Sequence, residues 1–536
     1  SACLVGSEMC IRDRSKRDTF YGYDKMNRLS YVKNQNDDNS YVYTEYMYDE
    51  AGNLTDQYVG STGLGKKDGQ HSSYTYDYLN RLTKHTDAMG YEESYISYDG
   101  NNNLLAVTDK NGKTIRTEYS VENKPKSITV DGTNEKTEYQ YYKTGLTKSI
   151  KTLDKNSKEQ TSSYEYDSFG RTIKESQTDN LVNEYNYNLM DLRTEVKIKN
   201  GSNQILHQSY EYNDLNQLYR VYNGSVSNSN ILAAYTYNSN GNITNIQNAN
   251  GTETLYEYES AKSPNLLTKV TNRKYNEAVQ SSFTYSYYQD GNISGVTEQI
   301  GEKVRNLGYT YDKQGRLKTE TDSVYTNKSY TYDNYGNRIS QTDGSKSTNY
   351  VYDNNNRLIT ETSADGAAER NVNYSYDRVG NMIYKSVEKY SDSAEQAGYE
   401  IGGDFTPESE GATHYSYDSF NRLIGIQTDG LRVNYGYDAV GRRTSKTING
   451  ETTNQIWDGS NIVAEDGANK AVYYRGIGLI SENRNGVISY YQLNGTGGVV
   501  GQTNTAGEMI KSYQYDAFGN QLNKTENDNN PFRYNG

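Results

Sequence analysis

Cysteine, proline and long apolar runs are all scarce in this chain of 536 residues. Its two cysteines, Cys3 and Cys10, both lie within the first ten residues, so no disulfide framework or cysteine-based metal site organises the rest. No stretch approaches the roughly 18 consecutive apolar residues of a membrane span. The longest apolar patch, 471–480, is interrupted by Arg475. These shortages argue against a disulfide-stapled domain and against a membrane span.

Basic and aliphatic residues are also in short supply. The net charge is −13, and no cluster of lysine and arginine provides the basic surface that binds nucleic acid, so we expect no nucleic-acid partner. Hydrophobic residues make up only 33% of the chain, a composition that tends towards disorder. The 58 tyrosines reverse that expectation, because tyrosine buries a large ring while its hydroxyl stays hydrogen-bonded. Tyrosine and threonine favour strands, so we predict an all-β chain with an aromatic core.

One short motif recurs along the chain. It reads Tyr-x-Tyr-Asp, then two or three residues, Gly or Asn, Asn or Arg, and an aliphatic residue. Successive copies start mostly about 20 to 29 residues apart, a spacing typical of repeat architectures. Clear copies start at Tyr21, Tyr46, Tyr74, Tyr164, Tyr309, Tyr330, Tyr350, Tyr374, Tyr415, Tyr435 and Tyr513. Degenerate copies start at Tyr185, Tyr210, Tyr235, Tyr256 and Tyr285.

Each copy predicts one β-hairpin. Side chains alternate along a strand, so both tyrosines fall on one face and the polar x residue on a wetter face. The aspartate ends the strand and accepts a hydrogen bond from the backbone two residues on. A glycine then supplies a positive φ, as we expect at Gly52, Gly170, Gly315, Gly336, Gly380 and Gly441. The second strand ends at another turn, such as Asp429-Gly430, which is a strong hairpin signal.

The number of hairpins constrains the overall shape. Roughly 18 to 20 units give close to 40 strands, which would form a flat sheet on the order of 180 Å wide. Twisted sheets of that width do not stay flat and open. We therefore predict repeated hairpins wound into a spiral β-sheet shell or a barrel-like cocoon, which also hides most strand edges. Both faces remain candidates for the tyrosines.

The chain divides into three regions. Residues 1–14 lack the repeat and the charged start and apolar run of a signal peptide. We interpret them as a non-native, adapter-derived segment that replaces the true N-terminus. Residues 15–450 are the predicted repeat shell, interrupted at 391–413 by an acidic, glycine-rich insertion that we expect to form a surface loop. Residues 451–536 are more aliphatic and contain the single tryptophan.

The motif resembles the tyrosine-aspartate (YD) repeats of RHS and wall-associated bacterial proteins, of toxin-complex C proteins and of teneurins. The resemblance covers about residues 19–450. The tail, from Asn494 through Tyr513-Gln-Tyr-Asp516 to Gly536, resembles the start of the RHS repeat-associated core domain. Thr496 and Gly498 stand where Gram-positive relatives commonly have histidine and aspartate, so no role is carried over to them.

The resemblance implies a hollow β-shell that encloses a toxin. Family members continue with a tyrosine-rich core stretch, an autocleavage motif with catalytic aspartates and a variable C-terminal toxin, and we expect this chain to stop before them. It implies a non-catalytic scaffold of a secreted bacterial polymorphic toxin, extracellular or attached to the cell surface, with the C-terminal toxin as its partner. The alternative is a cell-surface adhesin that binds glycans or proteins through the repeats. A third class is a β-solenoid polysaccharide enzyme, which requires two carboxylates away from the turn position to converge in one cleft.

No residue stands out as catalytic, cofactor-binding or metal-binding. The repeated aspartates occupy one turn position in every unit, which indicates turn capping rather than a catalytic pair. The four histidines, His71, His85, His207 and His414, are isolated, so we predict no zinc site or triad. Asp99–Asn103 and Asn527–Asn530 are the segments most similar to calcium loops, but both lack the full ligand pattern.

Overall fold

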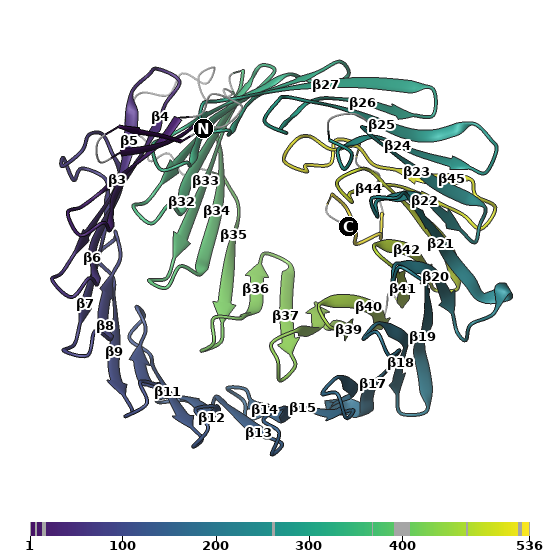
Figure 1. Ribbon diagram of the computed structural model, residues 1–536, viewed down its shortest axis with the longest axis horizontal. Coiled ribbons are helices and arrows are strands. Elements are labelled where there is room, and N and C mark those ends of the chain that lie inside the picture. Colours follow the sequence, from purple (N-terminus) through teal and green to yellow (C-terminus); the bar gives the residue numbers. More distant parts are fainter. Residues whose placement is uncertain are drawn as a thin grey trace.

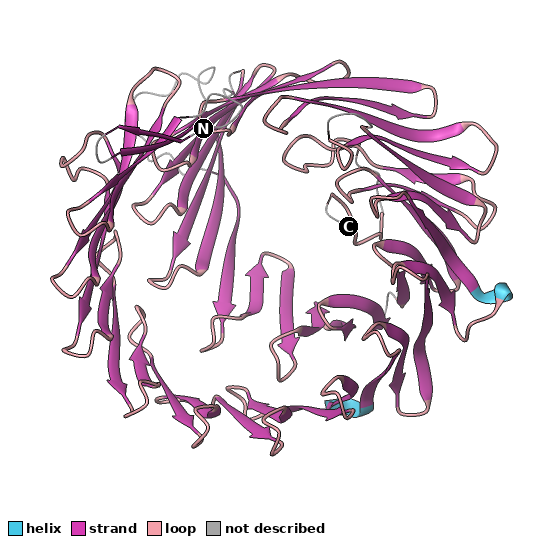
Figure 2. Ribbon diagram, in the orientation of Figure 1, coloured by secondary structure: helices cyan, strands magenta, loops and turns pink. Residues whose placement is uncertain are grey.

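The computed structural model describes residues 2–5, 8–12, 18–259, 263–366, 368–390, 408–467, 470–523 and 528–534. Within these ranges strands joined by turns make up the fold, and 45 strands form one sheet (Figure 2). Two single-turn 3-10 helices, η1 (Thr178–Asn180) and η2 (Asn228–Asn230), lie between strands. The all-β prediction is confirmed. No described helix has the length and apolar character that crossing a membrane requires.

The strands fall into two coils and a short N-terminal pair. The N-terminal pair is β1 (Ala2–Val5) and β2 (Glu8–Arg12). The first coil contains β3 (Asp18–Tyr23), β4 (Leu29–Gln35), β5 (Tyr41–Tyr48), β6 (Leu54–Ser61), β7 (Gln70–Tyr76), β8 (Leu82–Thr86), β9 (Glu92–Tyr98), β10 (Leu104–Thr108), β11 (Thr114–Tyr119), β12 (Pro125–Val130), β13 (Lys136–Tyr141), β14 (Thr147–Leu153), β15 (Glu159–Tyr166), β16 (Thr172–Gln177), β17 (Leu181–Tyr187), β18 (Arg193–Asn200), β19 (Asn203–Tyr212), β20 (Leu218–Asn223), β21 (Ile231–Tyr237), β22 (Ile243–Asn248), β23 (Thr252–Tyr258), β24 (Leu267–Lys274), β25 (Val279–Tyr287), β26 (Ile293–Ile300) and β27 (Lys303–Tyr311).

The second coil contains β28 (Leu317–Asp322), β29 (Lys328–Tyr332), β30 (Arg338–Asp343), β31 (Lys346–Tyr352), β32 (Leu358–Asp365), β33 (Ala368–Tyr376), β34 (Met382–Tyr390), β35 (Glu408–Tyr417), β36 (Leu423–Thr428), β37 (Leu431–Tyr437), β38 (Arg443–Ile448), β39 (Glu451–Asp458), β40 (Asn461–Gly467), β41 (Ala471–Arg475), β42 (Leu479–Arg484), β43 (Val487–Leu493), β44 (Val499–Thr503) and β45 (Met509–Ser512). The C-terminal segment, described at 513–523 and 528–534, follows β45.

The sheet is a single antiparallel meander. Each strand pairs with its neighbours in sequence, as β15 pairs with β14 and with β16. The turns between strands lie alternately along the two long borders of this ribbon, where the strands end, and we call these borders its edges. The YD edge carries the turns that follow Tyr-x-Tyr-Asp, such as Asp167–Arg171, and the far edge carries the intervening turns, such as Asp154–Lys158. Each predicted unit is therefore one hairpin, as the repeat indicated.

A β-bulge recurs at the second tyrosine of the motif. The register shifts between Glu165 and Tyr166, and again between Thr310 and Tyr311 in a distant unit. A bulge bends its strand and increases the local right-handed twist. Repeated at the same position in unit after unit, the bulges bend the ribbon in a consistent direction. The ribbon winds into an open spiral (Figure 1).

The spiral narrows towards its C-terminal end. Side chains that join the two coils are 281 residues apart at Asp37–Lys318, 267 apart at Glu175–Arg442 and 188 apart at Lys328–Asp516. One full turn of the spiral therefore takes fewer residues towards the C-terminal end, so the later coil has a smaller circumference. In Figure 1 strands β39–β45 accordingly lie inside the ring formed by the first coil.

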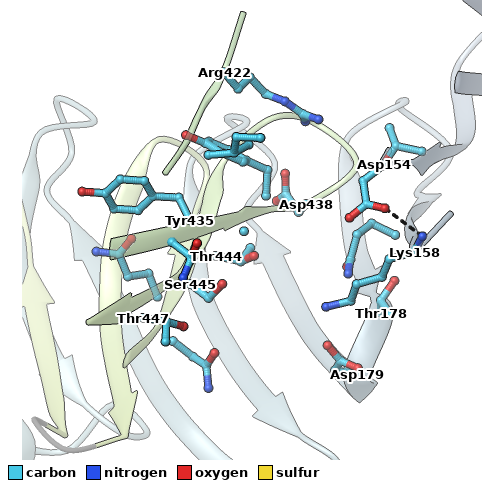
Figure 3. A pocket seen from close by; sticks show the side chains of 18 of the residues that line it. Asp154, Lys158, Thr178, Asp179, Arg422, Tyr435, Asp438, Thr444, Ser445 and Thr447 are labelled. Carbon is cyan, nitrogen blue, oxygen red and sulfur yellow. Dashed lines mark hydrogen bonds between the residues drawn. The ribbon is translucent and has the colours of Figure 1, made fainter. Parts of the chain in front are cut away.

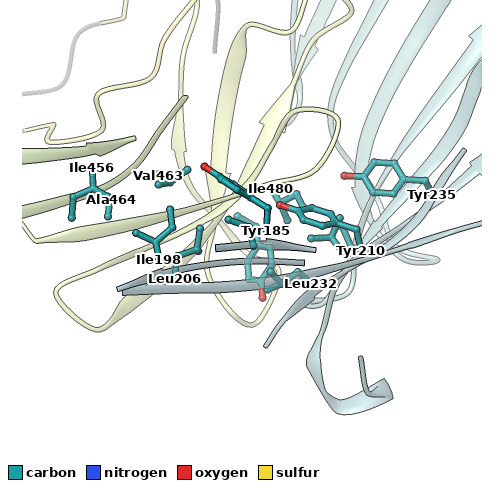
Figure 4. Close-up of a cluster of buried hydrophobic side chains, with 14 residues drawn as sticks. Tyr185, Ile198, Leu206, Tyr210, Leu232, Tyr235, Ile456, Val463, Ala464 and Ile480 are labelled. Carbon is teal, nitrogen blue, oxygen red and sulfur yellow. The ribbon is translucent and has the colours of Figure 1, made fainter. Parts of the chain in front are cut away.

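The core forms where the second coil packs against the inner face of the first. One cluster joins side chains of β17–β21 to side chains of β39–β43, and includes Val196, Val221, Ile456 and Ile480 (Figure 4). Gly476 permits the close approach, since a Cβ there would lie 2.2 Å from the hydroxyl of Tyr235. Two further clusters pack the C-terminal strands against one another and against β24–β25.

One region boundary differs from expectation, and the interpretation of the N-terminal segment is not tested. The predicted surface loop at 391–413 is too long, because 408–413 belong to β35; residues 391–407 lie outside the described part of the chain. Strands β1 and β2, in the segment interpreted as non-native, pair with each other, and β2 pairs with β3. The origin of residues 1–14 stays a prediction.

Candidate functional site: the inner face of the coil

The tyrosines of the motif face the inside of the spiral. Tyr185, Tyr210 and Tyr235, each the first tyrosine of its copy, are buried against strands of the inner coil. The hydroxyl of Tyr285 accepts a hydrogen bond from the N–H of Gly495 in that coil, at 2.8 Å. The intervening x residues are predominantly exposed, which confirms the wetter face predicted for them. The structure thus resolves the question of face for these units: the repeat lines its interior with aromatic rings.

The second tyrosine of each copy bonds to the preceding hairpin. Its hydroxyl donates to the main-chain carbonyl at the start of the previous second strand, as in Tyr48 to Leu29 at 2.9 Å and Tyr166 to Thr147 at 2.9 Å. Trp457 takes the same place with its indole N–H, which donates to the carbonyl of Arg443 at 2.8 Å. This ladder explains why the position requires an aromatic residue with a donor. Sequence reasoning missed it because the partner carbonyl is not encoded in the motif.

The aspartate of the motif caps its turn as predicted. Asp167 accepts bonds from the N–H groups of Phe169 and Arg171 through one oxygen, and from the Arg171 guanidinium through the other. Arg171 then donates to the carbonyl of Asn188 in the next unit and lies over the ring of Tyr187. Where asparagine replaces arginine, as at Asn53, its amide bridges Asp49 and Asn80 in the same way. The Asp–Arg ladder therefore couples neighbouring hairpins along the YD edge.

The two coils join by a repeated contact between opposite edges. The YD edge of the second coil docks on the far edge of the first. Asp37 on the far edge accepts bonds from the backbone N–H of Lys313 at 2.9 Å and from the Lys318 ammonium at 2.6 Å. Asn111 and Glu135 accept the corresponding N–H groups of Arg378 and Ser419, at 3.0 and 3.3 Å. Carboxylate or amide oxygens on the far edge thus accept a hydrogen bond from the backbone N–H of the residue that follows the capping aspartate.

The last copy of the motif leaves the sheet and docks on the inner side of β26–β29. Arg305, 2% exposed, forms ion pairs with Glu298 and Asp322 and donates to the carbonyl of Tyr515 at 3.0 Å. Lys328 pairs with Asp516 at 2.6 Å. These contacts form the C-terminal docking site, in which a buried charge network holds residues 513–517.

Burial sets the ionisation of the carboxylates at the C-terminal docking site. It raises the pKa of Glu298, which hydrogen-bonds Gln514 and Arg305. It also raises the pKa of Glu320, which accepts the N–H of Ala517 at 3.1 Å. For Asp516 burial opposes ionisation, but hydrogen bonds from Lys328 and Asn520 outweigh it and lower the pKa. Carboxylates away from the turn position do converge here, and they are engaged by protein groups that anchor the segment.

A polar cleft of about 830 Å³ separates the coils on another part of the spiral (Figure 3). Turns of the first coil at 154–158 and 178–181 form one wall, and strands β35–β40 form the other. Tyrosine rings, carboxylates and guanidinium groups line it together, among them Tyr435, Tyr437, Asp154, Asp179, Arg422 and Arg432. This combination offers flat rings and charged hydrogen-bonding groups to a polar ligand.

The histidines occupy separate places in the sheet. His71 stacks on Tyr58 and pairs with Asp56, and His85 stacks on Tyr74. His207 pairs with Glu195, while His414 lies beside Tyr384.

In the described parts of the two calcium-like segments, the side chains bond protein groups; Asn527 lies outside the described residues. Asp99 caps Asn101 and Asn103, whose amides bond Asn123, and Asp528 pairs with Lys511 and Arg533. Among the described residues no group of three His, Cys, Asp or Glu side chains is placed to hold a metal ion.

The hairpins wind into an open spiral. The repeated unit bonds to the preceding hairpin through a tyrosine hydroxyl and caps its turn with an aspartate, and these features define a YD-repeat shell. The sequence matches the Teneurin YD-shell family over residues 267–536. The chain belongs to this family.

The sequence is also similar to the tRNA nucleases WapA of two Bacillus species. It is 28% identical over 294 residues to the tRNA3(Ser)-specific nuclease WapA of Bacillus spizizenii. The matched region covers 48% of this chain and 12% of the nuclease. It is 27% identical over 213 residues to the tRNA nuclease WapA of Bacillus subtilis strain 168, covering 34% of this chain and 9% of the nuclease. The chain thus spans about an eighth or less of the length of these relatives.

Among solved structures, the chain resembles TcdB2–TccC3 without its hypervariable C-terminal region, with 13% identity and a TM-score of 0.41. That match covers 97% of this chain and 35% of the solved one. A Tc holotoxin pore of Photorhabdus luminescens gives 13% identity and a TM-score of 0.32.

Proposed function

We propose that this chain is the non-catalytic shell of a secreted RHS-type toxin and that its inner face holds a polypeptide cargo. The observation that carries the proposal is the narrowing spiral whose inner face is lined by the motif tyrosines. Rings with bonded hydroxyls offer apolar contact without strong charge, which suits a polypeptide of varied sequence. Burial raises the pKa of Tyr374, a partly exposed first tyrosine of the motif, to about 12, so this hydroxyl stays neutral at physiological pH.

The direction of the chain supports the same proposal. Phe532 packs edge-on against Tyr473 and Tyr491, and Tyr534 packs against Tyr515, so the described end of the chain lies on the inner side of the narrow coil. A polypeptide joined after this segment starts inside the spiral. Membership of the YD-shell family and the similarity to WapA nucleases favour a toxin as that polypeptide. Extracellular or cell-surface placement is part of this proposal.

A fusion experiment tests the proposal. An unstructured, protease-sensitive reporter is joined after residue 536 in one protein and before residue 18 in another, and each is digested under conditions that leave the shell intact. We expect the C-terminal reporter to be cleaved several-fold more slowly than the N-terminal one. Equal rates for the two fusions would show that the inner face does not shelter the attached chain.

The polar cleft favours a second function, an adhesin that binds carbohydrate. Flat rings such as Tyr435 beside carboxylates and guanidinium groups can stack on a sugar ring and bond its hydroxyls. A glycan array with the purified chain tests this function. We expect any bound glycan to be lost on Tyr435→Ala, and an array without signal removes the adhesin from consideration.

A further inference from the structure

The C-terminal docking site contains a buried lysine. Lys328 lies on β29 and is 7% exposed. Its ammonium is 2.6 Å from the carboxylate of Asp516, which is 4% exposed, and 3.8 Å from that of Asp343. Every other lysine whose exposure the structure describes is partly or fully exposed. A lysine is rarely buried to this degree, because taking an ammonium out of water is costly even when a carboxylate pairs with it.

A second carboxyl group faces the same pair. Glu320 lies directly opposite Lys328 in the pairing of β28 with β29, and it is 1% exposed. Both of its hydrogen-bond donors in the described chain are neutral: the N–H of Ala517 at 3.1 Å and the hydroxyl of Tyr330 at 3.3 Å. Burial raises the pKa of Glu320, which favours the protonated acid. The site therefore holds an amine, a carboxylate and a buried carboxylic acid side by side.

Two other contacts between lysine and aspartate lack this combination. Lys110 pairs with Asp87 at 2.6 Å, and Lys511 pairs with Asp528 at 2.8 Å. In both pairs the aspartate is buried, but the lysine side chains are 20% and 28% exposed, so water still solvates the ammonium. The amine at Lys328 is desolvated as well as paired, and desolvation is one of the ways in which a lysine becomes a nucleophile.

We propose that Lys328 and Asp516 condense to an isopeptide bond, which joins β29 covalently to the C-terminal segment, and that Glu320 carries the protons of the reaction. The link is an amide between the lysine Nζ and the aspartate Cγ. It closes a covalent ring through β29–β45 in a chain that has no cysteine after Cys10. This inference does not depend on the proposed function, because a cross-linked shell can hold cargo or bind glycans.

The reaction balances without a co-reactant. It starts from the ion pair, in which a proton passes from the Lys328 ammonium to the Asp516 carboxylate across their hydrogen bond and leaves a neutral amine and a neutral acid. The lone pair of Nζ then attacks Cγ and forms the C–N bond. Glu320 gives a proton to the departing hydroxyl and takes one from the nitrogen, so the C–O bond breaks and one water leaves. Glu320 ends in the protonation state in which it began.

Burial and contact favour the condensation. Two groups held in contact react as if at an effective concentration on the order of 10⁵ M or more. The product amide is neutral, so the buried site no longer bears the desolvation cost of the ion pair. Oδ1 of Asp516 keeps accepting the N–H groups of Phe518 and Asn520, so the turn stays capped. A cavity of about 300 Å³ borders Asp516 and gives the departing water a way out.

Mass spectrometry of the native chain tests the bond. We expect the intact protein to weigh one water less than its sequence, and a digest to contain a branched peptide in which Lys328 is joined to Asp516. Fragmentation of that peptide is needed because a succinimide at Asp429-Gly430 also loses one water. Separate, unmodified peptides for the two residues overturn the proposal. A branch to Asp343 instead overturns the assignment of Asp516.

Substitutions separate the bond from the ion pair and the proton carrier from a packing residue. Lys328→Arg keeps the charge but cannot form the amide, so the branched peptide should disappear. Lys110→Arg, at the pair with Asp87, is the matched control and should leave the branched peptide in place. Glu320→Gln keeps the shape of the side chain but carries no proton. We expect its cross-linked fraction to fall about tenfold or more, with the amides of 513–517 still protected from hydrogen exchange. Complete cross-linking in this variant contradicts the role of Glu320.

A cut made after denaturation detects the covalent ring directly. A specific protease site inserted after Gly430 lies between the two joined residues, in a turn that tolerates insertion. After denaturation and cutting, we expect the parent chain to remain one piece and the Lys328→Arg chain to separate into two. Two separate pieces from both chains show that no such bond forms.

Discussion

The two halves of the first coil use the same hairpin and are held together differently. From β3 to β16 neighbouring units are joined mainly by Asp–Arg or Asp–Asn ladders, as at Asp77–Arg81 and Asp167–Arg171. From β17 to β25 the capping residue is asparagine in three successive units, Asn188, Asn213 and Asn238, and no arginine follows it four residues later. There the inner face is covered by the second coil, and aliphatic side chains are buried beside the first tyrosines of the motif.

The difference shows that the repeat encodes the hairpin and the departures from it encode the packing. The side chain opposite the first tyrosine is Val196 or Val221 in the covered half. In the open half it is polar in some units, such as Gln57 and His85, and aliphatic in others, such as Val32 and Ile150. A buried valine is stabilised by the coil that covers it, whereas an aliphatic side chain at an open position stays partly exposed and gains less. The ion ladder is retained where packing from the second coil is absent.

The largest expected effect comes from breaking the buried network at the C-terminal docking site. Arg305→Ala leaves Glu298 and Asp322 buried without their cation, a loss that typically costs about 3–5 kcal/mol. We expect the free energy of unfolding to fall accordingly and residues 513–517 to exchange amide hydrogens faster. Arg116→Ala removes a solvent-exposed pair with Asp131 and should lower the free energy of unfolding far less. Equal losses for the two would contradict a structural role for the network.

A matched pair of core substitutions compares the two halves directly. Ile198 is fully buried under the second coil, and Ile150, opposite Tyr139 in the open half, is only half-buried. Ile198→Ala should cost about 2–5 kcal/mol through lost burial and a residual cavity, and Ile150→Ala clearly less. Denaturant unfolding of both variants measures the difference. Similar losses would mean that the second coil adds little to burial of the first.

Turn substitutions should not distinguish the halves. Gly170 in the open half has φ of +81° and Gly241 in the covered half has φ of +82°, as the motif predicted for glycines at this position, among them Gly315 with φ of +78°. A β-branched residue tolerates this region poorly, so Gly170→Val and Gly241→Val should each destabilise their hairpin by about 1–3 kcal/mol. Hydrogen exchange should localise each effect to adjacent units, because repeats couple mainly to neighbours. Thermal unfolding identical to the parent would show the turn assignment to be wrong.

The smallest expected effect tests the ion ladder of the open half. Arg171→Gln removes the pair with Asp167 and the stacking on Tyr187, and the loss of stability should be small because the site is solvent-accessible. High salt should reduce that contribution, because it screens exposed pairs. We therefore expect the difference in free energy of unfolding between variant and parent to decrease as the salt concentration is raised. A difference independent of salt would indicate that stacking alone carries the contact.

The hairpins, their turns and the winding followed from the sequence because they depend on local chemistry. Alternating tyrosines, a capping aspartate and a glycine of positive φ act within one unit. The meeting of the coils did not follow, because it joins residues nearly 300 positions apart. A signal for it was present: the copies that read as degenerate, beginning at Tyr185, Tyr210 and Tyr235, are those whose rings the second coil buries.

The C-terminal docking site could not be predicted from the sequence, for a different reason. Glu298, Arg305 and Lys328 are ordinary strand residues of units that fit the motif, and nothing local marks them as buried. Their environment arises only when Tyr513–Ala517 leaves the sheet and returns across the spiral. The sequence did indicate that the tail changes character after residue 450, but not where the tail would lie.

Because every strand pairs with the one made just before it, the ribbon can grow in the order of translation. Closing each new hairpin costs only a short loop, so early strands need not wait for distant ones. The first coil can form as it leaves the ribosome and then serve as the template on which the later, tighter coil is laid. The meander thus gives the protein a built-in order of assembly, from the wide end to the narrow one.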